Sequence, residues 1–127
     1  MTREGNGRAA LILFAHGSRD AQWAEPFRAI QRKVAAARPD LVVEVAFLEI
    51  MAPSLPDAVS RLAGSDHTRI TIAPLFMARG AHLKRDLTAM LDELRLAHKG
   101  VGLSLLPAAG EVDEVLDAIG GWLVKHA

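Results

Sequence analysis

Residues 9–15 have the sequence AALILFA, and HGS follows at 16–18. A short, continuous apolar run that stops at a turn is typical of a strand buried on both faces. The run therefore predicts a buried first strand whose exit is formed by HGS. Buried strands of this kind occur in parallel sheets covered by helices, so the stretch favours an α/β fold.

Beyond this strand, predicted helices and strands alternate along the rest of the chain. Asp20 can cap a helix whose apolar side chains recur every three to four residues. The elements that follow are a strand at 41–48, a helix from Ser54 to about Leu62, a strand at 69–73, a helix at 83–94, a strand at 101–106 and a helix at 112–123. This βαβαβαβα order predicts a three-layer sandwich, with a four-stranded parallel sheet and helices on both faces.

The composition limits the number of domains and the classes of function. The chain has 127 residues, half of them apolar, and we expect one domain at 9–127 after a disordered arm at 1–8. Its 15 basic and 15 acidic residues balance, which disfavours nucleic acid as a partner. The absence of cysteine excludes disulfides, thiolate catalysis and cysteine metal ligands.

The sequence also disfavours a membrane protein and a nucleotide-binding protein. The apolar run at 9–15 is too short for a membrane span or a typical signal core, so we expect a cytoplasmic protein with no membrane partner. Neither a Walker loop nor a Gly-x-Gly-x-x-Gly fingerprint occurs, which disfavours nucleotide binding.

A potential metal ligand follows each of the first three predicted strands: His16, Glu49 and His82. Ligands of parallel sheets bind beyond the carboxyl ends of the strands, so we expect these three side chains at one rim. Two imidazoles and a carboxylate suit a first-row divalent ion. The alternative is that the histidines only form hydrogen bonds or face solvent, and that Glu49 caps the next helix or remains solvated.

Basic residues surround the two histidines in the sequence: Arg19, Arg79, Lys84 and Arg85. Together they predict a locally basic region that suits a small polyanionic ligand. The alternative is a solvated face of surface ion pairs. Asp86 lies four residues after His82, so on a helix it could orient that imidazole or simply be a surface acid.

The other histidines, His67, His98 and His126, are interpreted as bystanders because of their places at a turn, near a helix end and at the terminus. Trp23 and Trp122 occur at helical spacing among aliphatic residues. Packing or an oligomer contact explains them better than a cofactor site.

Three sequence blocks resemble the CbiX/SirB-type sirohydrochlorin chelatases in order and spacing. The blocks are AHGSRD at 15–20 with Trp23 and Pro26-Phe27, AFLE at 46–49 with Pro53, and PLFMARGAH at 74–82 with Asp86. The resemblance extends to about Gly110-Glu111 and departs from the usual pattern at Ala81 and Thr88. It implies a chelatase-like fold of the short, single-domain form, which acts as a homodimer.

The resemblance also implies a reaction and roles for individual residues. His16 and His82 would bind the metal, with Glu49 at the same site, and all three would be catalytic. Ser18, Arg19, Arg79, Lys84 and Arg85 would contact the substrate, sirohydrochlorin. The expected reaction inserts Co²⁺, or alternatively Fe²⁺ or Ni²⁺, for cobalamin, siroheme or related cofactor synthesis. The metal is then a substrate, and no permanently bound cofactor is expected.

Two other functions compete with this hypothesis. A carrier of metal or tetrapyrrole would keep both histidines without turnover, and sequence does not separate binding from insertion. Phosphoryl transfer through His16 is the second alternative, but such phosphatases place arginine before the histidine, where this chain has Ala15.

Overall fold

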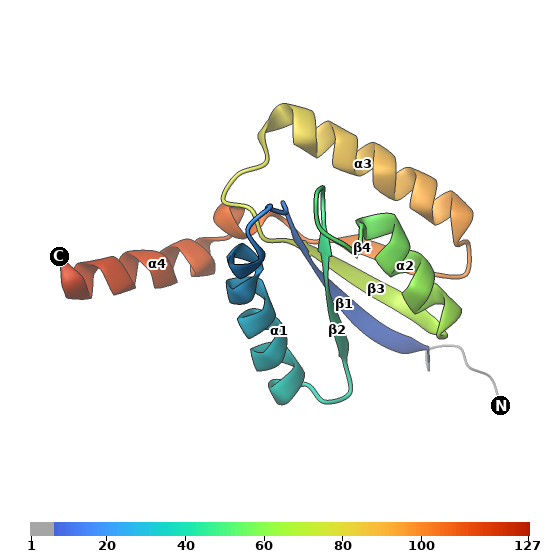
Figure 1. Ribbon diagram of the computed structural model, residues 1–127, viewed down its shortest axis with the longest axis horizontal. Coiled ribbons are helices and arrows are strands. Elements are labelled where there is room, and N and C mark those ends of the chain that lie inside the picture. Colours follow the sequence, from blue (N-terminus) through green and yellow to red (C-terminus); the bar gives the residue numbers. More distant parts are fainter. Residues whose placement is uncertain (1–6) are drawn as a thin grey trace.

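Strand β1 (Arg8–Ala15) lies inside a four-stranded parallel sheet of order β2-β1-β3-β4 (Figure 1). This computed structural model describes residues 7–127. β1 pairs with both β2 and β3, and its side chains Ile12 and Phe14 are completely buried. The continuous apolar sequence of β1 follows from this position, because both of its faces are covered.

Helices and strands alternate as predicted, which confirms the α/β three-layer fold. The other strands are β2 (Val42–Phe47), β3 (His67–Pro74) and β4 (Gly102–Leu105). The helices are α1 (Glu25–Ala37), α2 (Leu55–Gly64), α3 (Gly80–Ala97) and α4 (Asp113–His126), with short 3-10 helices η1 (Ala21–Ala24) and η2 (Ala109–Glu111). Within residues 7–127, none of the helices is both long and apolar enough for a membrane span.

The boundary of the predicted N-terminal arm differs from the structure. Residues 1–6 lie outside the described part of the chain, but β1 already begins at Arg8. Arg69 donates a hydrogen bond to the carbonyl oxygen of Gly7 (3.0 Å), and Arg8 donates one to that of Ser65 (3.2 Å). The prediction that the arm reaches residue 8 is therefore wrong, because these contacts fix residues 7 and 8 to the sheet.

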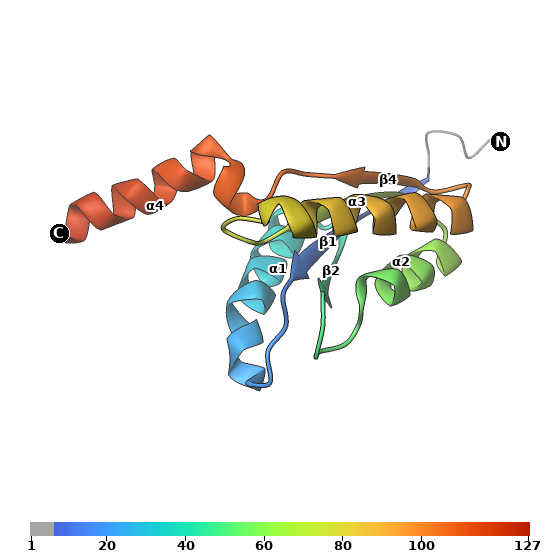
Figure 2. The same cartoon turned by 90° about the horizontal axis from the view of Figure 1, so that it is seen from above.

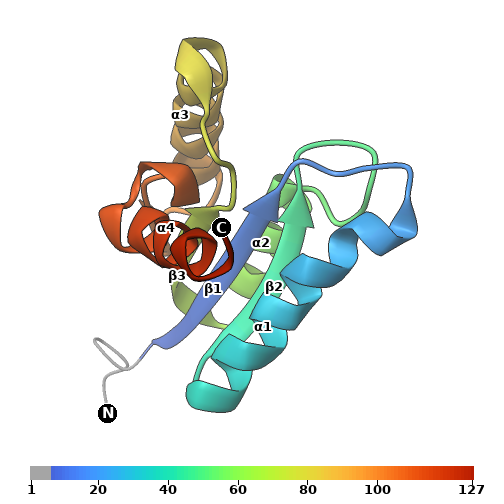
Figure 3. The same ribbon diagram turned by 90° about the vertical axis from the view of Figure 1, so that its left-hand side faces the viewer.

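Helices cover the two faces of the sheet unevenly (Figure 3). α2 and α3 pack on one face, where Leu55, Val59, Leu87 and Leu91 are buried against the strands. On the other face, α1 packs mainly on β1 and β2. α4 has no buried residue and projects away from the sheet (Figures 1 and 2).

Backbone hydrogen bonds join the loops at the carboxyl rim of the sheet. The N–H groups of Leu48 and Glu49 donate to the carbonyl oxygens of Ala15 (2.8 Å) and His16 (3.1 Å). On the other side of β1, the N–H of Leu75 donates to the carbonyl oxygen of Phe14 at 2.8 Å. After β1 the chain turns to the face of the sheet that α1 covers, whereas after β3 it turns to the face that α3 covers. The carboxyl rim between β1 and β3 is therefore a topological switch point.

Gly17 lets the loop after β1 approach the loop after β2. Its φ is +104°, and a Cβ atom at this position would overlap the carbonyl oxygen of Glu49. A residue with a side chain would therefore have both an unfavourable backbone conformation and a clash with backbone. The positions of His16 and Glu49 both depend on this close approach.

We predict that Gly17→Ala lowers the free energy of unfolding by about 1–3 kcal/mol, the usual cost of a strained backbone position. Urea denaturation measures the change. Gly64→Ala is the matched control, because Gly64 ends α2 without a positive φ and with open space around it. The control should be neutral or stabilising by up to about 1 kcal/mol. Equal stability of the two variants would contradict this account of Gly17.

Candidate active site

One cavity of about 530 Å³ lies at the carboxyl rim, between the loops after β1 and β2 and the first turns of α3. It is lined by His16, Leu48, Glu49, Arg79, His82, Leu83, Asp86, Leu87 and Met90. The three potential ligands predicted from separate strand exits thus line the same cavity. Their convergence follows from the parallel sheet, which brings the ends of β1, β2 and β3 to one rim.

His16 is exposed, and its ring packs against an aromatic side chain. The ring centroids of His16 and Phe76 are 5.0 Å apart with an interplanar angle of 55°, and Phe76 in turn contacts Phe14 at 5.7 Å. Since Phe14 and Phe76 are buried, the imidazole has a rigid apolar support on one side. This support holds its orientation at the mouth of the cavity.

Glu49 lies in the loop that connects β2 with α2. It is exposed, and it does not cap α2, because Ser54 has that role and accepts a hydrogen bond from the N–H of Asp57 at 3.2 Å. Ile50, the next residue, has φ +72°, an uncommon conformation for a β-branched residue. The capping alternative for Glu49 is therefore wrong, and the carboxylate borders the cavity.

His82 is the third residue of α3, and 86% of its side chain is exposed. Its Nε2 lies 3.5 Å from Oδ2 of Asp86, which is longer than a normal hydrogen bond. Within residues 7–127, no three histidine, aspartate or glutamate side chains lie close enough together to hold a metal ion. The two histidines and Glu49 therefore share a cavity in an open arrangement that is not assembled into a coordination sphere.

Arg79 supplies a fixed positive charge at the wall of the cavity. Only 9% of its side chain is exposed, and its guanidinium donates to Oε1 of Glu111 at 2.8 Å. The same carboxylate oxygen accepts a hydrogen bond from the N–H of Ala108 (3.1 Å). These hydrogen bonds lower the pKa of Glu111, and the bond from Arg79 is the larger cause. Nε of Arg79 is buried without a hydrogen-bond partner among the described residues.

Glu111 is a structural partner of the site that the sequence analysis missed. It follows Gly110, whose N–H donates to the carbonyl oxygen of Phe76 at 2.9 Å, and a Cβ at Gly110 would overlap the backbone of Met77. The contact with Arg79 joins residues 32 positions apart, so no local spacing indicates it. Its only sequence signal was its place at the end of the family resemblance.

The remaining predicted substrate-binding residues do not line this cavity. The hydroxyl of Ser18 accepts a hydrogen bond from the N–H of Asp20 (3.1 Å), and Arg19 is exposed in the same loop. Lys84 and Arg85 line a different hollow on α3, with Asp92. Of the four basic residues, Arg79 alone faces the histidines in the described structure. Contacts of all five predicted residues with substrate, Arg79 included, stay predictions.

Two of the histidines interpreted as bystanders have partners elsewhere. His67 is buried at the start of β3, at the opposite rim, with Nδ1 3.0 Å from the carbonyl oxygen of Leu62. Nε2 of His98 lies 3.3 Å from the hydroxyl of Ser60. Neither residue lines the cavity.

Sequence comparison shows relatives that cover most of the chain. The family model named CbiX matches residues 10–121. The sirohydrochlorin cobaltochelatase of Sulfurisphaera tokodaii is 34% identical over 104 residues, which cover 82% of this chain and 81% of that protein. The enzyme of the same name from Methanosarcina acetivorans is 30% identical over 96 residues, 76% of this chain and 72% of that protein.

Solved structures share the fold. A putative cobalamin biosynthesis CbiX protein from Marinobacter aquaeolei has a TM-score of 0.79 and 32% identity, with 92% of this chain and 95% of that chain covered. The sirohydrochlorin chelatase SirB of Bacillus subtilis, solved with cobalt, has a TM-score of 0.71 and 24% identity. The match covers 94% of this chain and 51% of SirB, so this chain spans about half of SirB. The length and identity of these matches, on a shared fold, place the chain in the CbiX family.

Proposed function

We propose that the protein is a tetrapyrrole metal chelatase that inserts a divalent ion into sirohydrochlorin. The observation that carries this proposal is the convergence of His16, Glu49 and His82 on one open cavity. Membership of the CbiX family and the relatives named sirohydrochlorin cobaltochelatase support it. The chemistry that follows is derived from the residues that line the cavity.

Metal insertion requires that the ion lose water, that two pyrrole N–H protons leave and that the ring deform. Neutral imidazoles bind first-row divalent ions and also accept protons, so His16 and His82 suit the first two needs. Glu49 relays protons or completes the coordination of the ion. The ion is a substrate that must leave with the product, and an open ligand arrangement permits this release.

Both apolar and charged groups near the cavity suit a flat ring with carboxylate substituents. Ile50 and Met77 are large, exposed apolar residues beside the cavity-lining segments, at 61% and 63% exposure. They can contact the face of a macrocycle. Arg79 offers a charge whose position is fixed by Glu111, so binding a carboxylate near it requires little ordering of the side chain.

Four features of this function remain predictions. The metal is expected to be cobalt, with iron or nickel as alternatives, since histidine and carboxylate ligands accept all three. The active form is expected to be a homodimer, and the protein is expected to work in the cytoplasm. The product would serve the synthesis of cobalamin, siroheme or a related cofactor.

The competing function is a carrier of metal or tetrapyrrole, and turnover separates the two. We predict that the purified protein, mixed with excess sirohydrochlorin and Co²⁺, Fe²⁺ or Ni²⁺, forms several metallated products per chain above the uncatalysed rate. The visible spectrum of the tetrapyrrole follows the reaction. A carrier would give a change that stops at one product per site, and this result would contradict the proposal.

We predict that His16→Ala and His82→Ala each reduce kcat/KM by roughly 10²–10⁴-fold, the usual contribution of a proton-transfer group. His98→Ala is the matched control, because His98 contacts Ser60 outside the cavity. Circular dichroism and urea denaturation check that all three variants are folded. Wild-type turnover of His82→Ala would remove that residue from the mechanism, and the same holds for His16→Ala.

The pair of Arg79 and Glu111 gives a prediction that combines stability with binding. The pKa of Glu111 is lower in the folded protein, so its charge stabilises the fold above the unfolded pKa, and this stabilisation is lost as the pH falls through the folded pKa. Glu111→Gln should therefore be less stable than wild type at neutral pH, with a gap that shrinks in acid. It should also raise KM for sirohydrochlorin, because Arg79 loses its anchor.

The control for this prediction is Asp40→Asn. Asp40 forms a similar surface pair with Arg38, which lowers its pKa, but neither residue lines the cavity. Asp40→Asn should change acid stability in the same sense and leave KM unaltered. If Glu111→Gln also left KM unaltered, Glu111 would support the fold without positioning Arg79 for substrate.

A further inference from the structure

Ile50 is held in a strained turn at the carboxyl rim, directly after Glu49. The N–H of Met51 donates to the carbonyl oxygen of Glu49 at 2.7 Å, so this hydrogen bond closes around Ile50 alone. With φ +72° at the central residue, the turn has the rare, strained form of the γ-turn. A β-branched side chain makes this conformation still less favourable. The turn therefore lowers the stability of the fold at this position.

The fold itself does not require isoleucine at this position. Ile50 is 61% exposed, so burial of its side chain offsets little of the strain. Glycine adopts a positive φ without strain and would keep the same turn. Among residues 7–127, Asp66 is the other non-glycine residue with a positive φ (+66°), but aspartate tolerates this conformation. Strain that the rest of the fold does not explain is typical of functional sites.

Met77 is a second exposed apolar residue at the same rim. It lies three residues after β3 ends, as Ile50 lies three residues after β2 ends. Gly110 packs on the backbone of Met77, since a Cβ at this glycine would overlap the carbonyl oxygen of Met77. The N–H of Gly110 also donates to the carbonyl oxygen of Phe76 at 2.9 Å. Backbone contacts thus fix the segments that carry both exposed apolar side chains.

The strand order places these two segments on either side of His16. β2 and β3 are the two neighbours of β1, and His16 follows the last residue of β1. Adjacent strands lie about 4.8 Å apart, so the exits of β2 and β3 are separated by about 10 Å. A flat ring of four pyrroles is wide enough to span this gap.

The cavity at the rim encloses only part of such a ring. Cavities of roughly 300–1,000 Å³ bury drug-sized ligands, and a tetrapyrrole with carboxylate substituents is larger than these. The cavity that contains the two histidines has a volume of about 530 Å³. The ring must therefore extend over the mouth of the cavity, where exposed residues of the surrounding loops contact it.

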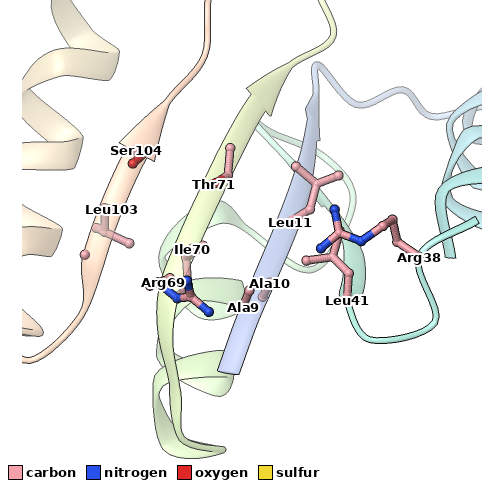
Figure 4. A pocket seen from close by; sticks show the side chains of 11 residues that line it. Ala9, Ala10, Leu11, Arg38, Leu41, Arg69, Ile70, Thr71, Leu103 and Ser104 are labelled. Atoms are coloured by element: carbon pink, nitrogen blue, oxygen red, sulfur yellow. The ribbon is translucent and has the colours of Figure 1, made fainter. Parts of the chain in front are cut away.

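A second basic hollow lies at the amino ends of the strands (Figure 4). Its volume is about 470 Å³, and its lining includes Arg38 and Arg69. Both guanidinium groups already have partners: Arg38 donates to the carboxylate of Asp40 (3.0 and 2.9 Å), and Arg69 donates to the carbonyl oxygen of Gly7 (3.0 Å). Neither a histidine nor a residue with positive φ lines this hollow. It is therefore the comparison site for the experiment below.

We propose that Ile50 is a substrate-binding residue whose strained turn presents an apolar side chain to the face of the tetrapyrrole. Met77 contacts the ring on the other side of His16. The two contacts seat the ring over the histidines, so they determine the affinity for the ring and leave the affinity for the ion unchanged. The inference rests on the proposed function for the identity of this ligand.

Substitutions of Ile50 separate the strain from the contact. For Ile50→Gly we expect a urea midpoint at or above that of wild type, together with a roughly tenfold higher Kd for metal-free sirohydrochlorin, the loss expected for one apolar contact. The fluorescence of the tetrapyrrole measures this Kd. Ile50→Leu keeps an apolar side chain and should bind sirohydrochlorin like wild type. Calorimetric titration with Co²⁺ alone should give one Kd for all three proteins.

Two variants at the amino ends of the strands are the matched controls. Asp66→Gly changes the other residue with a positive φ, and Arg69→Ala removes a cation from the hollow of Figure 4. Both should bind sirohydrochlorin with the affinity of wild type. Weaker binding by Arg69→Ala, with no change for Ile50→Gly, would place the ring in that hollow and overturn the proposal.

The outcomes distinguish this inference from the proposed function. Unchanged affinity of Ile50→Gly for sirohydrochlorin would overturn the role of Ile50, even in a protein that metallates the ring over many cycles. A urea midpoint below that of wild type would also overturn it, because Ile50 would then support the fold. A wild type that binds the ring but forms one product per site would contradict the chelatase alone. A wild type that does not bind sirohydrochlorin would overturn both.

Discussion

The hydrogen bond from the N–H of Glu49 to the carbonyl oxygen of His16 joins the two strand exits that border the cavity. It forms because β1 and β2 are parallel neighbours in register to Ala15 and Phe47, so their loops begin at the same height. It also needs Gly17, since any Cβ there would overlap the carbonyl oxygen of Glu49. The backbone of the site is thus fixed by the sheet, independently of any bound ion.

This rigid backbone contrasts with side chains that are open to solvent. His82 and Asp86 are largely exposed, whereas Arg79 beside them is nearly buried and paired. A site for a resident metal would hold its ligands in a fixed set with second partners. An ion that is a substrate must be released after each cycle, so solvent-exposed ligands on a fixed frame suit transfer better than storage.

The sequence predicted the sheet and the convergence of three residues because both follow from local patterns. Continuous apolar runs indicate buried strands, and the parallel order brings their carboxyl ends to one rim. Not all of the predicted basic residues line the cavity, and for Lys84 the reason can be read from the sequence. At 3.6 residues per turn, Lys84 lies about 200° around α3 from His82, whereas Asp86 lies within about 40°. Sequence proximity to His82 therefore did not place Lys84 in the cavity.

The pair of Arg79 and Glu111 was beyond local reasoning, and it links the site to the end of the chain. Glu111 lies in η2, two residues before α4 begins, and its carboxylate holds both Arg79 and the N–H of Ala108. The anchoring of α4 and the position of the cavity's buried cation thus depend on the same carboxylate.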